Sequence, residues 1–424
     1  MQITVDKIIY TGKSLGKING KVVLADEGLP GEIIEAAPIK EKRNYIAAKT
    51  ERIIKPSPER IKPRCEHYKA CSPYQYIDYE TQIMVKERQV KEFLIKSLKM
   101  EPDNIVMRRA NSIWNYRNKT HLHVVWESDR PSFAYHLPDS GGTFVKITDC
   151  FLLSEKINEL LNPLINIIGE NKLRFIEELS VRENSKKNQM LIVLYGSIKA
   201  DLGELNKHLN KLKNNFPIAG LLYSNKKTNK EYILDGEDYM EDYAGGMVFR
   251  VGATSFFQVN TGMLEQLIRD LKESMEISKK GAIADFYSGV GLFGITLSSL
   301  ASKIIAVESS GENVFFLKEN AKLNNVSNLT VYEGGCEKFA PHIFKETVDA
   351  LILDPPRKGA GEKLCSNILK NKPRLIFYIS CNPSTLVRDL KILMPFYKLK
   401  KNFIYDFFPQ TTHIETLSVL EKNS

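Results

Sequence analysis

The sequence predicts an α/β fold with a parallel sheet wound by helices, preceded by a small β-barrel and a mixed α+β region. From residue 282 onward, strand-like runs alternate with helical patterns, which is typical of a parallel sheet with helical connections. Residues 1–54 carry short β-rich runs, and residues 104–235 mix strand-like with helical patterns. These three regions with different patterns suggest two or three domains for a chain of 424 residues.

The composition favours a folded, basic protein. Hydrophobic residues make up 43% of the chain, which excludes wholesale disorder. The net charge of +9 fits a polyanionic partner such as nucleic acid, although a merely soluble basic protein is the alternative. No apolar run approaches the roughly 20 residues of a membrane helix, and the first residues do not resemble a signal peptide. We therefore expect a cytoplasmic protein without a membrane partner.

The barrel prediction depends on three short runs, Val5–Tyr10, Lys21–Ala25 and Glu32–Pro38, with a hairpin signal at Asn19-Gly20. A basic tract overlaps the end of this region, since residues 40–69 hold ten Lys or Arg against four Glu. A small barrel beside such a tract is a common way to hold single-stranded nucleic acid. A solvated face is the other interpretation of the tract.

The middle of the chain is less regular. Residues 78–100 show helical spacing, as do residues 155–168 and 202–215, whereas Val124–Trp126, 174–179 and 189–195 look like strands. The run Trp114-Asn115-Tyr116-Arg117-Asn118-Lys119 is dense in aromatic and cationic side chains. Such a run suits base stacking and phosphate contact, and a plain surface loop is the alternative.

The last region predicts a sheet whose carboxyl edge binds a ligand. Ligands of wound α/β sheets bind beyond the carboxyl ends of the strands. The expected strands are Ala282–Phe286, Lys303–Glu308, Leu329–Glu333, Val348–Asp354 and Arg374–Ser380, with helices over Ser309–Asn324 and Ser384–Met394 between or after them.

A glycine-rich loop closes the first of these strands. The run from Asp285 to Gly294 satisfies G-x-G-x-x-G, which dinucleotide-binding enzymes and methyltransferases share. Asp285 would attract the cationic amino-acid moiety of S-adenosylmethionine and would repel a pyrophosphate. Glu308, which ends the next strand, could accept ribose hydroxyls of either cofactor. The loop therefore favours a methyltransferase over an NAD oxidoreductase because of Asp285 alone.

Two further motifs follow later strands. Asp354-Pro355-Pro356-Arg357 ends one strand, and its two prolines stiffen the loop at the mouth of the expected pocket. Cys381, in Ser380-Cys381-Asn382-Pro383, follows the next strand and precedes a helix. A helix N-terminus would lower the pKa of this thiol and favour the thiolate. The alternative is that Cys381 is a buried cysteine that only packs in the core.

A thiolate at this place suits chemistry on a pyrimidine. Carbon 5 of uracil or cytosine is a poor nucleophile, and addition of a thiolate to carbon 6 activates it. A base must then remove the carbon-5 proton. Glu415 opens the final apolar strand and is the candidate base, with His413 as a second candidate. The target base must be flipped out of its stack to be reached.

Taken together and in this order, the motifs FFQVN (Phe256–Asn260), DxYxGxG, DPPR, SCNP and HIE resemble the RNA 5-methyluridine (uracil-C5) methyltransferases. The resemblance covers nearly the whole chain. It implies a Rossmann-like domain dependent on S-adenosylmethionine and an N-terminal TRAM domain, an OB-like RNA-binding barrel. It also implies residue roles: Cys381 is the nucleophile and Glu415 the base, and the cofactor contacts are Gln258, Tyr287, Glu308 and Asp354.

The resemblance further implies a domain plan and a substrate. We expect a TRAM-like barrel at 1–56, a central RNA-contacting domain at 57–77 and 109–240, and a catalytic domain at 78–108 and 241–424. The expected protein is a monomer that acts on RNA, 23S ribosomal RNA more than transfer RNA. Cytosine-C5 methylation and RNA binding without catalysis are the competing functions, and the SCNP and HIE pair favours uracil.

One departure from the family concerns iron. Many members bind a [4Fe-4S] cluster on C-x5-C-x2-C and a distant cysteine. Here Cys65 and Cys71 keep the first spacing and Cys150 could be the distant ligand, but Tyr74 stands at the third position. With three thiolates at most, we do not expect an intact four-cysteine cluster, and a cluster with an unusual fourth ligand is the alternative.

Overall fold

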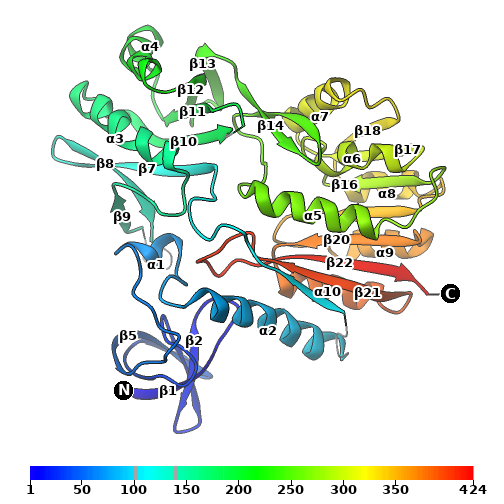
Figure 1. The fold of residues 1–424 in the computed structure, drawn as a ribbon, viewed down its shortest axis with the longest axis horizontal. Helices are drawn as coiled ribbons and strands as arrows, with labels where there is room; N and C mark the ends of the chain where they lie inside the picture. The colour runs from blue at the N-terminus through cyan, green and yellow to red at the C-terminus, as the bar shows by residue number, and fades with distance from the viewer. Residues whose placement is uncertain (100–103, 138–141, 185, 424) are drawn as a thin grey trace. The chain divides into compact units, whose positions relative to one another are not determined.

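The fold is taken from a computed structural model, which describes residues 1–99, 104–137, 142–184 and 186–423 (Figure 1). The chain divides into two compact units. The first unit comprises Met1–Asp103 and Phe408–Ile414, and the second comprises Asn104–Phe407 and Glu415–Ser424. Each unit is described separately below.

The first unit begins with a closed five-stranded barrel of order β1-β2-β3-β5-β4. Its strands are β1 (Gln2–Ile8), β2 (Ser14–Ile18), β3 (Lys21–Ala25), β4 (Ile33–Glu41) and β5 (Tyr45–Lys55). Alternate apolar side chains, such as Ile3, Val5 and Val23, fill the barrel interior. Asn19 and Gly20 both adopt positive φ in the two-residue turn between β2 and β3, as a type I′ hairpin requires. The predicted barrel is therefore confirmed, with β2 and β5 as strands that the sequence patterns did not resolve.

The basic tract is only partly a free cationic surface. Arg60 donates to Glu27 and Glu32 of the barrel at 2.6 Å each, and its side chain is largely buried. Lys69 pairs with Asp26 at 3.0 Å. A short helix α1 (Tyr68–Cys71) and the predicted long helix α2 (Tyr79–Leu98) follow in the same unit. Some cations of the tract therefore hold the barrel to the segment behind it.

The second unit contains a seven-stranded sheet of order β13-β12-β11-β10-β7-β8-β9. Helix α3 (Glu155–Glu170) packs on β8 and β10, and α4 (Leu202–Leu209) packs on β13. Its strands are β7 (Lys119–Glu127), β8 (Arg130–His136), β9 (Phe144–Ile147), β10 (Ile176–Asn184), β11 (Gln189–Gly196), β12 (Ile218–Asn225) and β13 (Lys230–Gly236). The expected mixture of strands and helices in this region is thus present, with the 3-10 turn η1 (Asn210–Asn214) ending the predicted helix over 202–215.

An eight-stranded sheet of order β18-β17-β16-β19-β20-β22-β21-β6 forms the rest of the second unit. Strands β18, β17, β16, β19 and β20 are parallel, whereas β22 runs antiparallel to both β20 and β21. The strands are β16 (Ala282–Phe286), β17 (Lys303–Glu308), β18 (Leu329–Glu333), β19 (Ala350–Leu353), β20 (Leu375–Ser380), β21 (Tyr397–Tyr405), β22 (Glu415–Lys422) and β6 (Ile105–Arg108). The parallel part matches the predicted strands closely, and the antiparallel end was not foreseen.

Helices form two groups around this sheet (Figure 1). Helices α5 (Thr261–Ser274), α6 (Leu292–Thr296) and α7 (Gly311–Leu323) contact the hairpin of β14 (Tyr239–Ala244) and β15 (Met247–Gly252). Helices α8 (Cys336–Ile343), α9 (Glu362–Asn371) and α10 (Pro383–Leu393) pack against one another in order. The turn η2 (Ser298–Leu300) follows α6. The chain order reverses at β16, with β17 on one side and β19 on the other, which is where wound sheets bind ligands.

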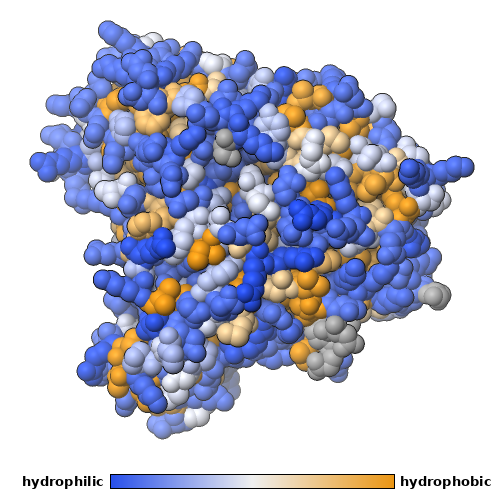
Figure 2. Space-filling model, in the orientation of Figure 1, coloured by the Kyte–Doolittle hydropathy of each residue, from blue (hydrophilic) through white to orange (hydrophobic). Residues whose placement is uncertain are grey.

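The face of the molecule seen in Figure 2 is mostly polar. Figure 2 shows hydrophilic residues over most of the visible face, with hydrophobic residues in small separate patches. Among the described residues, no helix is long and apolar enough to cross a membrane.

Candidate active site

The carboxyl edge of the eight-stranded sheet brings the predicted site residues to neighbouring strands. Glu308 ends β17, Tyr287 follows β16, Asp354 follows β19 and Cys381 follows β20. Since these four strands are parallel, their carboxyl ends share one edge. Glu415 joins them because β22 runs the other way and begins there.

The strand register sets Cys381 opposite Glu415. Ser380 on β20 pairs with Thr416 on β22 in the antiparallel ladder, and the Thr416 hydroxyl donates to the Ser380 carbonyl at 3.1 Å. Cys381 directly follows β20 and Glu415 is the first residue of β22, so the same register continued by one residue sets them opposite each other. Directly opposed residues of an antiparallel pair have Cα atoms about 4.5–5.5 Å apart. The proposed nucleophile and base are thus cross-strand neighbours.

The Cys381 thiol is a weak acid in this structure. Partial burial and the nearby Glu415 raise its pKa to about 11, and the Arg357 guanidinium opposes this only in part. The pKa is thus raised and not lowered as expected from the start of α10, with desolvation as the largest cause. Without RNA, the thiol form dominates at neutral pH.

Two carboxyl groups at the same edge are also held toward their neutral forms. Burial raises the pKa of Glu415 well above that of an ordinary glutamate, and the charge of Asp354 adds to the effect. Burial raises the pKa of Asp354 to about 7. A carboxyl group whose pKa is shifted toward neutrality is suited to accept and release a proton near physiological pH.

The glycine loop forms a cradle at the end of β16. Tyr287 has a φ of +62°, a strained value for a non-glycine residue and one that clusters at functional loops. A side chain at Gly289 would meet open space, so a ligand can approach the backbone there. Asp285 is fully buried and accepts from the Gly294 amide at 2.8 Å, but its second oxygen has no partner among the described residues. The Ser288 hydroxyl is likewise buried without one.

This donor and acceptor set fits S-adenosylmethionine. The buried Asp285 carboxyl, whose pKa burial raises to about 7, can take a cationic ammonium group, and the open Gly289 backbone leaves room for the rest. Glu308 is more restricted than expected. One of its oxygens accepts from the amides of Ser309 and Ser310 at 2.8 Å each, and the other accepts from the Gly289 amide at 2.9 Å. Only the second oxygen retains capacity for a ribose hydroxyl.

Gln258 is buried in the segment between β15 and α5. Two residues of the seven-stranded-sheet region hold this segment. Arg182 of β10 donates to the Ser255 carbonyl at 3.4 Å, and the Asn118 amide donates to the Val259 carbonyl at 3.1 Å. Asn260 caps α5 and also donates to the Phe407 carbonyl at 3.0 Å. The predicted aromatic–cationic run 114–119 therefore ends against the predicted cofactor loop.

Arg182 was not singled out from the sequence. It is 2% exposed, and its partner Asp242 lies 3.8 Å away. Burial lowers the pKa of Arg182 to about 10 and raises that of Asp242 to about 6. A single arginine in a strand-like run does not reveal that it is buried and paired, because only the fold shows which residues lie next to it.

The DPPR and SCNP loops are bonded to each other. The Asn382 side chain donates to the Arg357 carbonyl at 3.1 Å and accepts from the Ser384 amide at 3.1 Å, which makes it the cap of α10. The Thr385 hydroxyl also donates to the Arg357 carbonyl, at 3.2 Å. The bond between this cap and the DPPR loop was not foreseen from the sequence.

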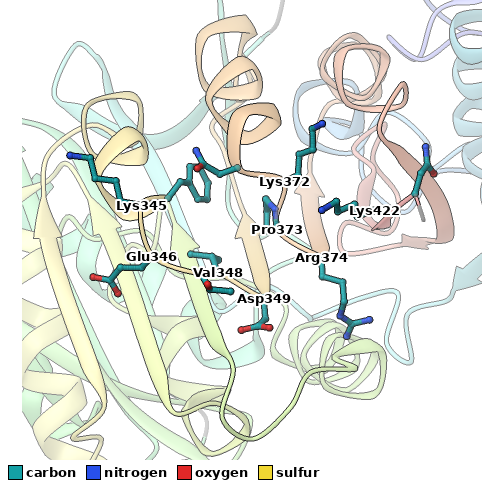
Figure 3. Close-up of a pocket in the computed structure, with 12 residues that line it drawn as sticks. Lys345, Glu346, Val348, Asp349, Lys372, Pro373, Arg374 and Lys422 are labelled. Carbon is teal, nitrogen blue, oxygen red and sulfur yellow. The ribbon is translucent and has the colours of Figure 1, made fainter.

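A groove of about 700 Å³ lies away from this site (Figure 3). Its lining comes from the segments before β19 and β20 and from the end of β22, at the amino edge of the sheet. Lys345, Lys372, Arg374 and Lys422 surround it together with Asp349. It is not the cofactor cradle, because it lies at the opposite ends of the same strands.

The cysteines named for a cluster fall in different units. Cys65 and Cys71 belong to the first unit and Cys150 to the second. Tyr74, at the third position of the family spacing, is a fully buried core residue whose hydroxyl accepts from Gln89 at 3.3 Å. The tyrosine therefore has a packing role of its own in the first unit.

His413, the second candidate base, also belongs to the first unit. Its side chain is exposed and its ring packs edge-on against Phe408, with the ring centroids 5.6 Å apart. Glu415, in contrast, belongs to the second unit with Cys381.

Comparisons with known proteins agree with this architecture. A sequence model of the tRNA (uracil-5-)-methyltransferase family matches residues 78–423. An uncharacterized RNA methyltransferase of Listeria innocua is 32% identical, over 99% of this chain and 97% of that protein. Another from Synechocystis sp. is 28% identical, over 99% and 95%.

Among solved structures, the Pyrococcus abyssi tRNA (uracil-54, C5)-methyltransferase in complex with S-adenosyl-L-homocysteine shares the fold. Its TM-score is 0.77 at 22% identity, and the match covers 99% of this chain and 100% of that one. The family model spans most of the chain and the Listeria relative matches it from end to end. The chain therefore belongs to the tRNA (uracil-5-)-methyltransferase family.

Proposed function

We propose that this protein methylates carbon 5 of a uridine in RNA through a covalent adduct on Cys381, with Glu415 as the base. The observation that carries the proposal is the cross-strand placement of Cys381 and Glu415 at the edge that also holds Asp354. Gln258, Tyr287, Glu308 and Asp354 are the residues assigned to hold S-adenosylmethionine. When bound, this cofactor supplies the methyl group.

The proposed reaction begins at the thiol. Cys381 loses its proton to solvent, and its lone pair forms a bond to carbon 6 of the uracil. The electron pair of the C5–C6 double bond moves toward carbon 4, giving an enolate whose carbon 5 is nucleophilic. Carbon 5 would form a bond to the methyl group, and the electron pair of the broken sulfur–methyl bond would stay on the sulfur of the cofactor. The ring is now saturated at both carbons and bonded to the protein.

Glu415 completes the cycle. Its carboxylate takes the proton from carbon 5, and the released pair restores the C5–C6 double bond. The pair of the sulfur–C6 bond returns to Cys381, which leaves as a thiolate. The raised pKa of Glu415 supports this role, because a weaker carboxylic acid has a more basic conjugate base.

The RNA class is the finer part of the proposal. The choice of 23S ribosomal RNA over transfer RNA derives from the family resemblance, while the family takes its name from transfer RNA. We propose ribosomal RNA as the first target to test.

Mass spectrometry of 5-methyluridine in separated ribosomal and transfer RNA, from cells with and without the gene, tests both levels. Loss of 5-methyluridine from 23S RNA alone supports the proposal. Loss from transfer RNA alone overturns the RNA class, and loss of 5-methylcytidine instead overturns the uracil assignment.

A further inference from the structure

Asp389 lies inside α10 and is fully buried. It is neither a sequence neighbour nor a strand-register partner of Cys381 or Glu415. At the usual rise of about 1.5 Å per residue, it is about 9 Å along the helix from Pro383. Its carboxylate collects several donors instead. One oxygen accepts from the Tyr378 hydroxyl at 2.6 Å, the Ala360 amide at 2.8 Å and the Gly361 amide at 3.2 Å.

These donors come from two other parts of the site region. Tyr378 belongs to β20, the strand that ends just before Cys381. Ala360 and Gly361 end the loop that starts at Asp354. Asp389 therefore joins β20, α10 and the loop after β19 through one buried carboxylate.

The loop is pressed onto α10 along its length. Gly359 closes a turn by donating to the Pro356 carbonyl at 2.8 Å, with a φ of +80°. A β-carbon at Gly359 would lie 2.6 Å from the Asp389 carboxylate and 2.6 Å from the Arg388 guanidinium. Only glycine can meet both the conformation and the close approach at this position.

Further bonds hold the middle of the loop. Arg388 donates to the Lys358 carbonyl at 2.9 Å and to the second oxygen of Asp389 at 2.9 Å. Asn382 and Thr385 hold the Arg357 carbonyl, as described above. Of the five residues from Arg357 to Gly361, four have backbone groups bonded to side chains of α10 or its cap. The fifth, Gly359, packs against α10 with no space for a side chain.

We propose that Asp389 is a positioning residue that fixes the loop bearing Asp354 and Arg357 to the helix that begins behind Cys381. This inference rests on the proposed function, because it matters for the reaction only if Cys381 attacks the base. The carboxylate suits the task because one oxygen accepts from three donors while the other accepts from Arg388. An asparagine that turned its carbonyl oxygen toward the three donors would aim its amide N–H₂ at the Arg388 guanidinium, which can only donate.

The test compares Asp389→Asn and Tyr378→Phe with the control Lys391→Ala, whose side chain is exposed on the same helix. We expect Asp389→Asn to lower the single-turnover rate of methyl transfer at least about tenfold, because a displacement near 1 Å at a reacting centre can cost about 100-fold. The KM for RNA should stay within about twofold, since the loop acts on alignment more than on binding. Tyr378→Phe should show the same split with a smaller loss, and Lys391→Ala should behave as the unaltered protein.

If Asp389 had a purely structural role, the results would differ. Such a role predicts a lower melting temperature with an unchanged rate well below that temperature, and this outcome in Tyr378→Phe overturns the proposal even if Asp389→Asn fails to fold. Cys381→Ala, assayed in parallel, separates a failure of the proposed function from a failure of the positioning role. If Cys381→Ala retains activity, the proposed function fails. If it is inactive while Asp389→Asn and Tyr378→Phe are fully active, only the positioning role fails.

Discussion

Cys381 lies opposite Glu415 at the ends of the neighbouring strands β20 and β22, but its thiol is mostly protonated. The thiolate is the nucleophile, and its population falls about tenfold for each pH unit below the pKa. With a pKa of about 11, the resting protein holds few thiolates at neutral pH. Because the Arg357 guanidinium lowers this pKa, it is the described group that favours the thiolate.

Alkylation of Cys381 by iodoacetamide, followed by peptide mass spectrometry, measures this directly. The rate in the absence of RNA should rise with pH up to at least pH 10, because the thiol titrates at about 11. Arg357→Ala should slow alkylation at a fixed pH, since the guanidinium lowers the thiol pKa, while the neighbouring Lys358→Ala should not. A plateau near pH 8 would show that the thiol is already activated and would contradict this account.

Glu415 has a separate assignment that its own variant can test. Glu415→Gln keeps the size of the side chain but removes the base that takes the carbon-5 proton. We expect turnover to fall by about 100-fold or more, the usual range for loss of general base catalysis. The adduct between Cys381 and methylated RNA should accumulate and remain visible on a denaturing gel. Turnover at the normal rate without a trapped adduct would remove Glu415 from this role.

Elements with a strong periodic pattern were predictable from the sequence. The strands at 282–286, 303–308 and 329–333 agree with the prediction residue for residue, because buried parallel strands are continuous apolar runs bounded by turn residues. The antiparallel placement of β22 was not predictable, since strand direction depends on partners far along the chain. The same limit applies to Asp389 and Arg182, whose roles arise from segments that only the fold brings together.

Arg182 links β10 to the segment that carries Gln258, and its stability effect is testable. Arg182→Met leaves Asp242 buried without its counter-charge, which typically costs about 3–5 kcal/mol of unfolding free energy. Replacing both residues, as in Arg182→Met with Asp242→Leu, should recover most of that loss. Urea denaturation at pH 8 measures both variants.

The stability cost of Arg182→Met should depend on pH in a direction set by the Asp242 carboxyl. The Asp242 carboxyl already has a pKa raised to about 6, and loss of Arg182 raises it further. Protonation then removes the unpaired charge, so the cost of Arg182→Met should be smaller at pH 5 than at pH 8. An equal cost at both values, or a double variant as unstable as the single one, would argue against a buried ion pair.

For the whole molecule, the family, the enzyme class and the fold are confirmed by the family match, the relatives and the shared fold. The closed barrel and the wound sheet were both expected from the spacing of short strands and from strand–helix alternation. The division into three domains at 1–56, 57–77 with 109–240, and 78–108 with 241–424 stays a prediction, as do the cofactor contacts. The absence of an intact four-cysteine cluster also stays a prediction, which an iron assay on anaerobically purified protein would test.

The central claim is that Cys381 forms the bond to uracil, and one measurement addresses it most directly. The unaltered protein and Cys381→Ala are incubated with S-adenosylmethionine and 23S RNA, and 5-methyluridine is quantified by mass spectrometry alongside cofactor affinity by calorimetry. We predict no 5-methyluridine from Cys381→Ala with cofactor affinity within about threefold of the unaltered protein, because the thiol is needed for attack and not for cofactor binding. Formation of 5-methyluridine by Cys381→Ala at the normal rate would contradict the account.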